Sequence, residues 1–203
     1  MIKNISIINY DLSNMFSIYN AIEKLGFYSK ITKLKKDIEN SDLLILPGTG
    51  SFPVAMKNLK NQGLINPIKN HIKNGKPFLG ICLGYQLLFS SSEEFENCKG
   101  LNIFDIEVKN LRHLNIKTPI IGWLPLLAKK ENCFKSFDKK FFYFVHSYYV
   151  SSEKSFGASY VEVNNEKICS SIQKDNIVAT QFHPEKSGKD GLDLLKKIIN
   201  QYK

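Results

Sequence analysis

The sequence has no long hydrophobic run. Of its 203 residues 43% are hydrophobic, yet no apolar stretch approaches the ~20 residues that a membrane-spanning helix needs. The N-terminus, Met1–Ile5, also lacks the apolar segment and small-residue cleavage site of a signal peptide. We therefore expect a soluble, cytoplasmic protein with no membrane partner. Its length fits a single domain over residues 1–203 with one sizeable core.

Clustered metal ligands are also missing. The cysteines form no Cys-x-x-Cys pair, and none lies near a histidine at zinc-ligand spacing. The four cysteines are Cys82, Cys98, Cys133 and Cys169. In a cytoplasmic chain we expect them to be free thiols, and we expect neither a metal nor a cofactor.

Basic residues exceed acidic ones, with a formal net charge of +9, but they are not arranged as a nucleic-acid-binding surface. Most are scattered lysines, and the densest early cluster, Lys33–Lys36, is followed at once by Asp37 and then Glu39. No Arg-rich stripe alternates with aromatic residues. We expect a solvated, Lys-rich surface and no nucleic-acid partner. Attraction of a phosphorylated substrate or an acidic partner surface stays open.

Strand and helix patterns alternate in the first half of the chain. The apolar runs that predict buried strands are residues 5–8, 43–46 and 77–80. Helical spacing predicts a first helix that Asn14 caps and Gly26 ends, and a second helix around residues 64–73. Strand, helix and strand in succession predict a parallel sheet with crossover helices.

The second half of the chain has a different pattern. Aromatic and β-branched runs predict strands at residues 141–150, 157–163 and 176–182, with Asn164-Asn165 as a turn. We expect these strands to extend the same sheet in antiparallel fashion. The chain ends in an amphipathic helix with Leu192, Leu195, Ile198 and Ile199 on one face. The predicted fold class is α/β, a mostly parallel sheet flanked by helices with an antiparallel extension in the C-terminal half.

A cysteine between two glycines is the candidate nucleophile. Gly80-Ile81-Cys82-Leu83-Gly84 follows a predicted strand and precedes a helical pattern at residues 85–89, as in the cysteine version of a nucleophile elbow. The sharp turn strains the backbone, and side chains two residues away on either side would collide. A helix start also favours the thiolate. By itself the motif fits an inert, buried cysteine equally well, and the other three cysteines lack even this setting.

His183 and Glu185 are the candidate base and its orienting carboxylate. A thiol that forms an acyl intermediate needs a base, and the base needs a third group to fix its tautomer. In an extended His183-Pro184-Glu185, residues two apart point the same way, and Pro184 favours that geometry. A loop histidine with an incidental acidic neighbour is the alternative, and the cysteine elbow argues against it.

The remaining histidines do not share this setting. His71 and His113 lie in polar, Lys- and Asn-rich segments, so we expect both at the surface. His146 lies within the strand pattern of residues 143–148, where a lone histidine is more often structural or substrate-facing than catalytic.

Pro47-Gly48-Thr49-Gly50 is the candidate oxyanion segment. It follows a predicted strand, and two glycines around one residue permit peptide orientations that bulkier residues forbid. We expect the backbone N–H of Thr49 to point at a developing oxyanion, alongside the N–H of Leu83. Alone, Pro-Gly is an ordinary turn signal.

Together these segments resemble the class I (triad) glutamine amidotransferases. The matching residues are Pro47–Gly50, Gly80–Gln86 and Phe182–Glu185. Three stretches resemble, more narrowly, the glutaminase subunits of imidazole glycerol phosphate synthases. They are LPGTGSFPVAM at 46–56, YFVHSY at 143–148 and QFHPEKSGKDGL at 181–192. The resemblance extends over nearly the whole chain, and the last stretch is its most specific signature.

The resemblance implies a flavodoxin-like fold and hydrolysis of L-glutamine to glutamate and ammonia by Cys82, His183 and Glu185. The substrate-binding residues that it implies are Gly48, Gly50, Gln86, Ser147 and Tyr148. It also implies a heterodimer with a cyclase (β/α)8-barrel subunit. The barrel receives the ammonia for imidazole glycerol phosphate synthesis in histidine biosynthesis.

Three segments depart from the family pattern. Residues 10–14 read Tyr-Asp-Leu-Ser-Asn where the family usually has Tyr-Gly-x-Gly-Asn, and Thr49 stands where it commonly has Val. Residues 120–124 read Ile-Ile-Gly-Trp-Leu in place of His-Met-Gly-Trp-Asn. The first and third segments belong to regions that the family uses near its partner. The resemblance extends to a divergent branch of the family associated with bacterial surface sugars. It therefore implies an alternative to the histidine pathway, in which the same chemistry supplies ammonia for amidination of such a sugar.

Two other classes of function compete with this hypothesis. A non-catalytic regulatory subunit has no need of an intact Cys82, His183 and Glu185. A cysteine-elbow hydrolase or chaperone-like protein of similar fold has no need of Gln86 or of the His-Pro-Glu segment.

Overall fold

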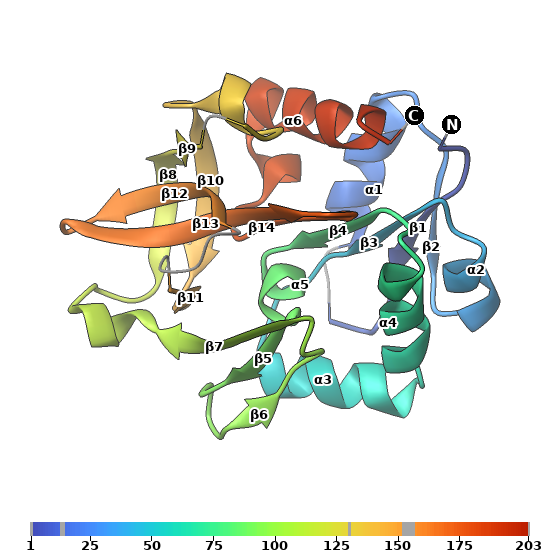
Figure 1. Cartoon of the computed structure of the whole chain (residues 1–203), viewed down its shortest axis with the longest axis horizontal. Coiled ribbons are helices and arrows are strands. Elements are labelled where there is room, and N and C mark those ends of the chain that lie inside the picture. The colour runs from blue at the N-terminus through green and yellow to red at the C-terminus, as the bar shows by residue number, and fades with distance from the viewer. Residues whose placement is uncertain (1, 13–14, 130, 152–156, 203) are drawn as a thin grey trace.

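The structure, a computed structural model, describes residues 2–12, 15–129, 131–151 and 157–202. In this part of the chain an eight-stranded sheet, in the order β2-β1-β3-β4-β14-β13-β12-β9, has helices on both faces (Figure 1). Its strands are β1 (Ile5–Ile8), β2 (Ser29–Thr32), β3 (Leu43–Leu46), β4 (Phe78–Ile81), β9 (Leu127–Ala128), β12 (Gly157–Val163), β13 (Glu166–Lys174) and β14 (Ile177–Thr180). Asn14, the expected cap of the first helix, lies outside the described residues.

The sheet changes from parallel to antiparallel pairing at β14. Strands β2, β1, β3, β4 and β14 pair in parallel, in the 2-1-3-4-5 order of flavodoxin-like folds. Beyond β14, the strands β13, β12 and β9 pair antiparallel. The predicted fold class is thus confirmed.

Helices pack on both faces because the buried strands alternate their side chains between the faces. Ile5 and Ile7 of β1 join the core on one face, and Ile8 joins the core on the other. The first face is covered by α1 (Met15–Lys24) and α6 (Gly188–Asn200), and the second by α2 (Lys35–Glu39), α3 (Phe52–Asn61) and α4 (Ile65–Lys73). No helix in the described ranges is long and apolar enough to cross a membrane.

Two predicted turns are confirmed. Gly26, with φ of +79°, follows the end of α1. Asn164 and Asn165 join β12 to β13 with φ of +52° and +66°. Positive φ at two successive central residues is the geometry of a tight hairpin turn that asparagine tolerates.

The predicted placement of residues 141–150 in the main sheet is wrong. Strand β10 (Phe141–His146) pairs with β8 (Ile120–Pro125) in a separate two-stranded sheet. Strand β11 (Tyr148–Val150) joins a four-stranded sheet with β7 (Phe104–Asn110), β5 (Phe89–Ser92) and β6 (Cys98–Lys99). Alternating hydrophobicity identifies a strand but not its neighbour, which long-range packing decides.

The predicted helix at residues 85–89 is mostly wrong as well. Helix α5 (Leu83–Gln86) is one turn long, and Phe89 already begins β5. Leu87 and Leu88 have carbonyl groups that accept hydrogen bonds from Leu101 and Ile103. A short apolar run fits a buried strand as well as a helix, and here the distant backbone partners decide.

His71 is buried, against the prediction of a surface position. Only 2% of its surface is exposed, and its ring nitrogens lie 3.2 Å from the carbonyl oxygen of Ile38 and 2.9 Å from that of Pro77. Burial lowers its pKa. The prediction relied on the polar residues next to His71 in the sequence, but His71 lies on the inner face of α4. His113 is exposed as predicted and pairs with Glu93 at 2.8 Å.

These two histidines provide a matched test of burial. We expect His71→Leu to lower the free energy of unfolding by about 1–3 kcal/mol, because the neutral imidazole donates to one buried carbonyl group, which loses its donor. His113→Leu loses only an exposed contact with Glu93 and should cost about 1 kcal/mol or less. Urea unfolding at pH 7 measures both. Equal, small losses would contradict the assigned role of His71.

Candidate active site

Cys82 lies in a strained turn between β4 and α5. Its φ of +53° falls in the region that side chains other than glycine rarely adopt. A Cβ atom on Gly84 would collide with the backbone carbonyl of Leu46, and one on Gly80 would lie 2.9 Å from the carbonyl oxygen of Gly84. Both glycines are therefore required by close backbone approach, as the elbow predicts.

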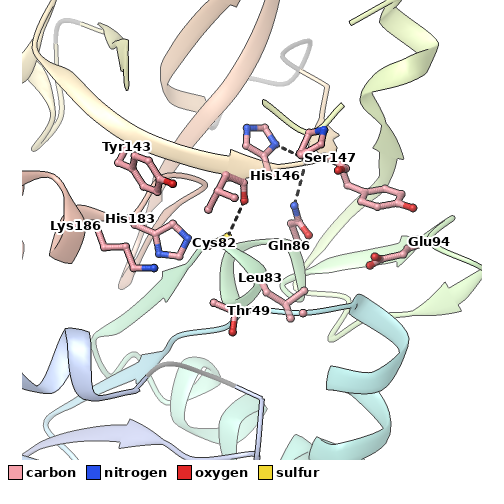
Figure 2. Close-up of a pocket in the computed structure, with 14 residues that line it drawn as sticks. Thr49, Cys82, Leu83, Gln86, Glu94, Tyr143, His146, Ser147, His183 and Lys186 are labelled. Carbon is pink, nitrogen blue, oxygen red and sulfur yellow. Dashed lines mark hydrogen bonds between the residues drawn. The ribbon is translucent and has the colours of Figure 1, made fainter. Parts of the chain in front are cut away.

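Cys82, His183 and Glu185 come together at the ends of β4 and β14. The Nδ1 atom of His183 lies 2.7 Å from Oε1 of Glu185, and the two side chains are 3% and 6% exposed. Nδ1–H therefore donates to the carboxylate, which leaves Nε2 for the nucleophile. Nε2 has no hydrogen-bond partner among the described residues, and Figure 2 shows the ring beside Cys82.

The electrostatics of this group favour a protonated His183. Burial is the largest single effect and opposes the charge, but Cys82 and Glu185 together outweigh it and raise the pKa of His183 to about 10. A cationic imidazolium held between a thiol and a carboxylate is suited to stabilise a thiolate and to donate a proton to a leaving group.

A pocket of about 460 Å³ opens in front of Cys82. It gathers most of the predicted site residues: Thr49, Gly50, Cys82, Leu83, Gln86, Ser147, Tyr148 and His183 (Figure 2). Glu185 and Gly48 are not in its lining. A Cβ atom on Gly48 would collide with the Tyr10 hydroxyl, so this glycine permits close packing and does not form the pocket wall.

The Thr49 amide is engaged elsewhere in this conformation, so its expected aim at an oxyanion stays a prediction. Its N–H donates to the carbonyl oxygen of Leu12 at 3.2 Å, and the Thr49 hydroxyl donates to the same oxygen at 3.0 Å. The Tyr10 hydroxyl, which is fully buried, donates to the carbonyl of Pro47 at 2.7 Å. The 10–12 segment therefore holds the oxyanion segment with the Thr49 donor occupied. At Leu83, the first residue of α5, the N–H is at a position that has no intrahelical acceptor.

Glu94 is a pocket residue that the sequence did not reveal. Its carboxylate accepts the backbone N–H of Phe52 at 2.7 Å, and burial raises its pKa. No motif surrounds it, because it reaches the pocket only when β5 and the loop after it fold against α3. It places a hydrogen-bond acceptor in the pocket with Cys82.

His146 fits the structural interpretation. It is 6% exposed, its Nδ1 lies 2.8 Å from the carbonyl oxygen of Tyr148, and burial lowers its pKa to about 4. It is therefore neutral at physiological pH and holds the 146–148 segment at the pocket.

Comparison with known proteins identifies a family and a fold. The family model of the class I glutamine amidotransferases matches residues 6–201. Imidazole glycerol phosphate synthase subunit HisH of Caldanaerobacter subterraneus subsp. tengcongensis is 47% identical over 96% of both chains. Subunit HisH 2 of Vibrio vulnificus is 43% identical over 98% of this chain and 95% of its own. Subunit HisH 1 of Campylobacter jejuni is 43% identical over 96% and 98%.

Solved structures agree on the fold. PurLQS from Thermotoga maritima superposes with a TM-score of 0.74 at 19% identity over the full length of both chains. A glutamine amidotransferase from the same organism superposes with a TM-score of 0.67 at 18% identity over 100% of this chain and 98% of its own.

We expect the titration of His183 to depend on Cys82. In the unaltered chain its imidazole should lose a proton near pH 10, and in Cys82→Ala at lower pH, because one of the groups that raise the pKa is gone. Since the folded pKa exceeds the ordinary ~6.5, its contribution to stability is full below pH ~6.5 and is lost as pH rises through about 10. NMR of labelled imidazole groups, with His113 as internal control, measures the midpoints. An unchanged His183 midpoint would argue against the pairing.

Proposed function

Because the chain belongs to the class I glutamine amidotransferase family, we propose that it is the glutaminase subunit of an imidazole glycerol phosphate synthase. It hydrolyses L-glutamine to glutamate and ammonia, and the ammonia serves histidine biosynthesis. Relatives carrying that name are 43–47% identical over nearly the whole chain. The observation that carries the proposal is the buried His183–Glu185 pair, whose imidazole lines the same pocket as the strained Cys82. We assign this glutamine hydrolysis to a single domain, residues 1–203, of a cytoplasmic protein.

The chemistry follows from the positions of the three side chains. The Cys82 thiolate attacks the side-chain amide carbon of glutamine, and the His183 imidazolium donates a proton to the departing nitrogen, which leaves as ammonia. The resulting thioester is attacked by a water from which neutral His183 takes a proton. Glutamate and the thiolate are then released. Glu185 orients the imidazole and stabilises its cation throughout.

The same pocket has groups suited to an α-amino acid. The Glu94 carboxylate is suited to accept a hydrogen bond from the substrate ammonium group. A half-buried carboxylate gains a charge-assisted hydrogen bond from such a cation. Gln86, Ser147 and Tyr148 line the pocket with polar groups that can fix the rest of the substrate. These assignments give the pocket a preference for a zwitterion over a simple amide.

We assign the partner, a cyclase barrel, to the surface next to the pocket. Ile121 and Trp123 of β8 are 64% and 51% exposed. The Trp123 ring packs edge-on against Tyr143, which lines the pocket, with centroids 6.1 Å apart. Exposed apolar side chains grouped near a site are typical of an interface. A partner bound there receives ammonia directly from the pocket, in a heterodimer.

The oxyanion segment supplies a control point for this reaction. With its N–H bonded to Leu12, Thr49 cannot donate to the tetrahedral intermediate, and loss of one such donor typically costs roughly 10²–10³ in rate. Rotation of the peptide group between Gly48 and Thr49 would release the Thr49 N–H from Leu12. We assign that rotation to binding of the partner with its own ligand.

We expect Cys82→Ala to lower glutamine-dependent product formation by the complex at least about a thousandfold. Synthesis from added ammonia should be unchanged. The thiol is needed only to liberate nitrogen, and the partner performs the cyclisation. The assay compares the two nitrogen sources with the copurified partner. Equal loss with both sources would contradict this division of labour.

The same assay separates the two candidate acceptors. Formation of imidazole glycerol phosphate by the complex supports the histidine pathway. If the copurified partner forms no such product but aminates a sugar, the alternative of surface-sugar amidination replaces it.

We expect Thr49→Val to raise the glutaminase rate of the chain alone by about two- to tenfold, because the occupied state loses one hydrogen bond. The fully activated rate should change less. Thr49→Ser, which retains the hydroxyl, is the matched control. Steady-state glutamate release by the unaltered chain and both variants, with and without liganded partner, measures the six rates. A free subunit that already runs at the activated rate would rule out a gated oxyanion hole.

A further inference from the structure

A carboxamide that the candidate triad does not use lies against the nucleophile. Gln181, the residue after β14, has no exposed surface, and its Nε2 donates to Sγ of Cys82 at 3.7 Å. Its backbone N–H donates to the carbonyl of Ser170 at 2.8 Å, which fixes where the side chain starts. A buried amide is costly unless its groups are paired, so the partners of Gln181 define its role.

The direction of this amide is set by a backbone carbonyl. Nε2 of Gln86 donates to the carbonyl oxygen of Tyr148 at 3.2 Å and to Oε1 of Gln181 at 2.9 Å. A carbonyl oxygen only accepts, so Gln86 must present its NH₂ group on this side. Gln181 must then present its oxygen to Gln86 and its NH₂ group to Cys82. Hydrogen-bond logic thus fixes both amides.

Three groups surround the sulfur of Cys82 with different effects on its charge. The carbonyl oxygen of Val145, 4.0 Å away, can accept from a neutral thiol and repels a thiolate. The N–H of Gln181 favours the thiolate, because a donor to the charged form stabilises it. His183 also favours it while protonated. Unlike His183, Gln181 does not titrate, so its effect persists when the imidazole loses its proton.

We propose that Gln181 is a positioning residue that holds and stabilises the Cys82 thiolate through its amide N–H, with Gln86 orienting that amide. The inference rests on the proposed function only in taking Cys82 as the nucleophile. Because Gln86 also lines the pocket, two amides connect the pocket wall to the sulfur. The arrangement keeps the sulfur in place as His183 moves its proton during the reaction.

A purely structural role for Gln181 predicts something different. If its side chain only fills space, Gln181→Met, which is close in volume and has no N–H donor, leaves the ionisation of the thiol unchanged. If it donates to the sulfur, the same variant makes the thiolate harder to form. The pH profile of thiol reactivity separates the two roles.

The test is the rate at which iodoacetamide alkylates Cys82 in the full chain between pH 5 and pH 10. Mass mapping follows the Cys82 peptide separately from those of the other three cysteines. We expect Gln181→Met to move the midpoint of the rate profile upward by about one pH unit, with about tenfold slower alkylation on its acidic side. Gln86→Met should move it in the same direction by less, since the Gln181 amide survives without its orienting donor.

Ser170→Ala is the matched control. It removes a buried hydroxyl that lies 2.8 Å from the Ser159 hydroxyl, next to the backbone that anchors Gln181, without touching the sulfur. Its profile should coincide with that of the unaltered chain.

An unmoved midpoint in a Gln181→Met chain that still unfolds cooperatively would overturn the proposal. If that variant does not fold, Gln86→Met decides the matter, and an unmoved midpoint there overturns it equally. Alkylation by iodoacetamide displaces iodide from its methylene carbon and needs only the thiolate, so the assay reads the thiol whatever the substrate is. Loss of the proposed glutaminase function would appear as absent glutamate release by the unaltered complex, with the alkylation shifts still present.

Discussion

The backbone turn at Cys82 is the constraint on which the rest of the site depends. A side chain at φ of +53° is strained, and the turn exists because Gly84 approaches the carbonyl of Leu46 more closely than any side chain permits. That contact ties α5 to the end of β3, whose continuation is the oxyanion segment. The close backbone contact between Gly84 and Leu46 therefore positions both Cys82 and the segment that contains Thr49.

The parallel half of the sheet brings the remaining parts to the same edge. Strands β3, β4 and β14 are neighbours and run parallel, so their carboxyl ends deliver the oxyanion segment, Cys82 and His183 side by side. This is the edge at which open α/β sheets generally bind ligands. Strand β10 and the residues that follow it, Ser147 and Tyr148, then close one wall of the pocket. A backbone hydrogen bond, from the N–H of His183 to the carbonyl oxygen of Tyr143 at 3.0 Å, joins that wall to His183.

Two hydrogen-bonded groups act on the reacting atoms from opposite sides. On one side, Leu12 occupies the Thr49 amide and holds the site in a conformation short of one oxyanion donor. On the other, Gln86 and Gln181 direct an amide donor at the sulfur. Under the proposed function, Cys82 is held in place for attack while the Thr49 donor is kept from the oxyanion. Such a combination would limit wasteful hydrolysis and still permit rapid activation, because only one peptide has to rotate.

The sequence by itself determined what local patterns encode. The glycines around Cys82, the buried strands and the Asn164-Asn165 turn followed from short-range sterics and periodicity. The predicted extended geometry of His183-Pro184-Glu185 is wrong, because Pro184–Lys186 forms a 3-10 helix, and the imidazole and carboxylate meet across that turn. The tertiary structure decided the pairing of residues 141–150, the burial of His71, and the arrival of Glu94 and Gln181 at the pocket. It also decided which way the Thr49 amide points. These features depend on contacts between residues tens of positions apart. Local sequence preferences do not specify which distant carbonyl or amide group a residue will contact.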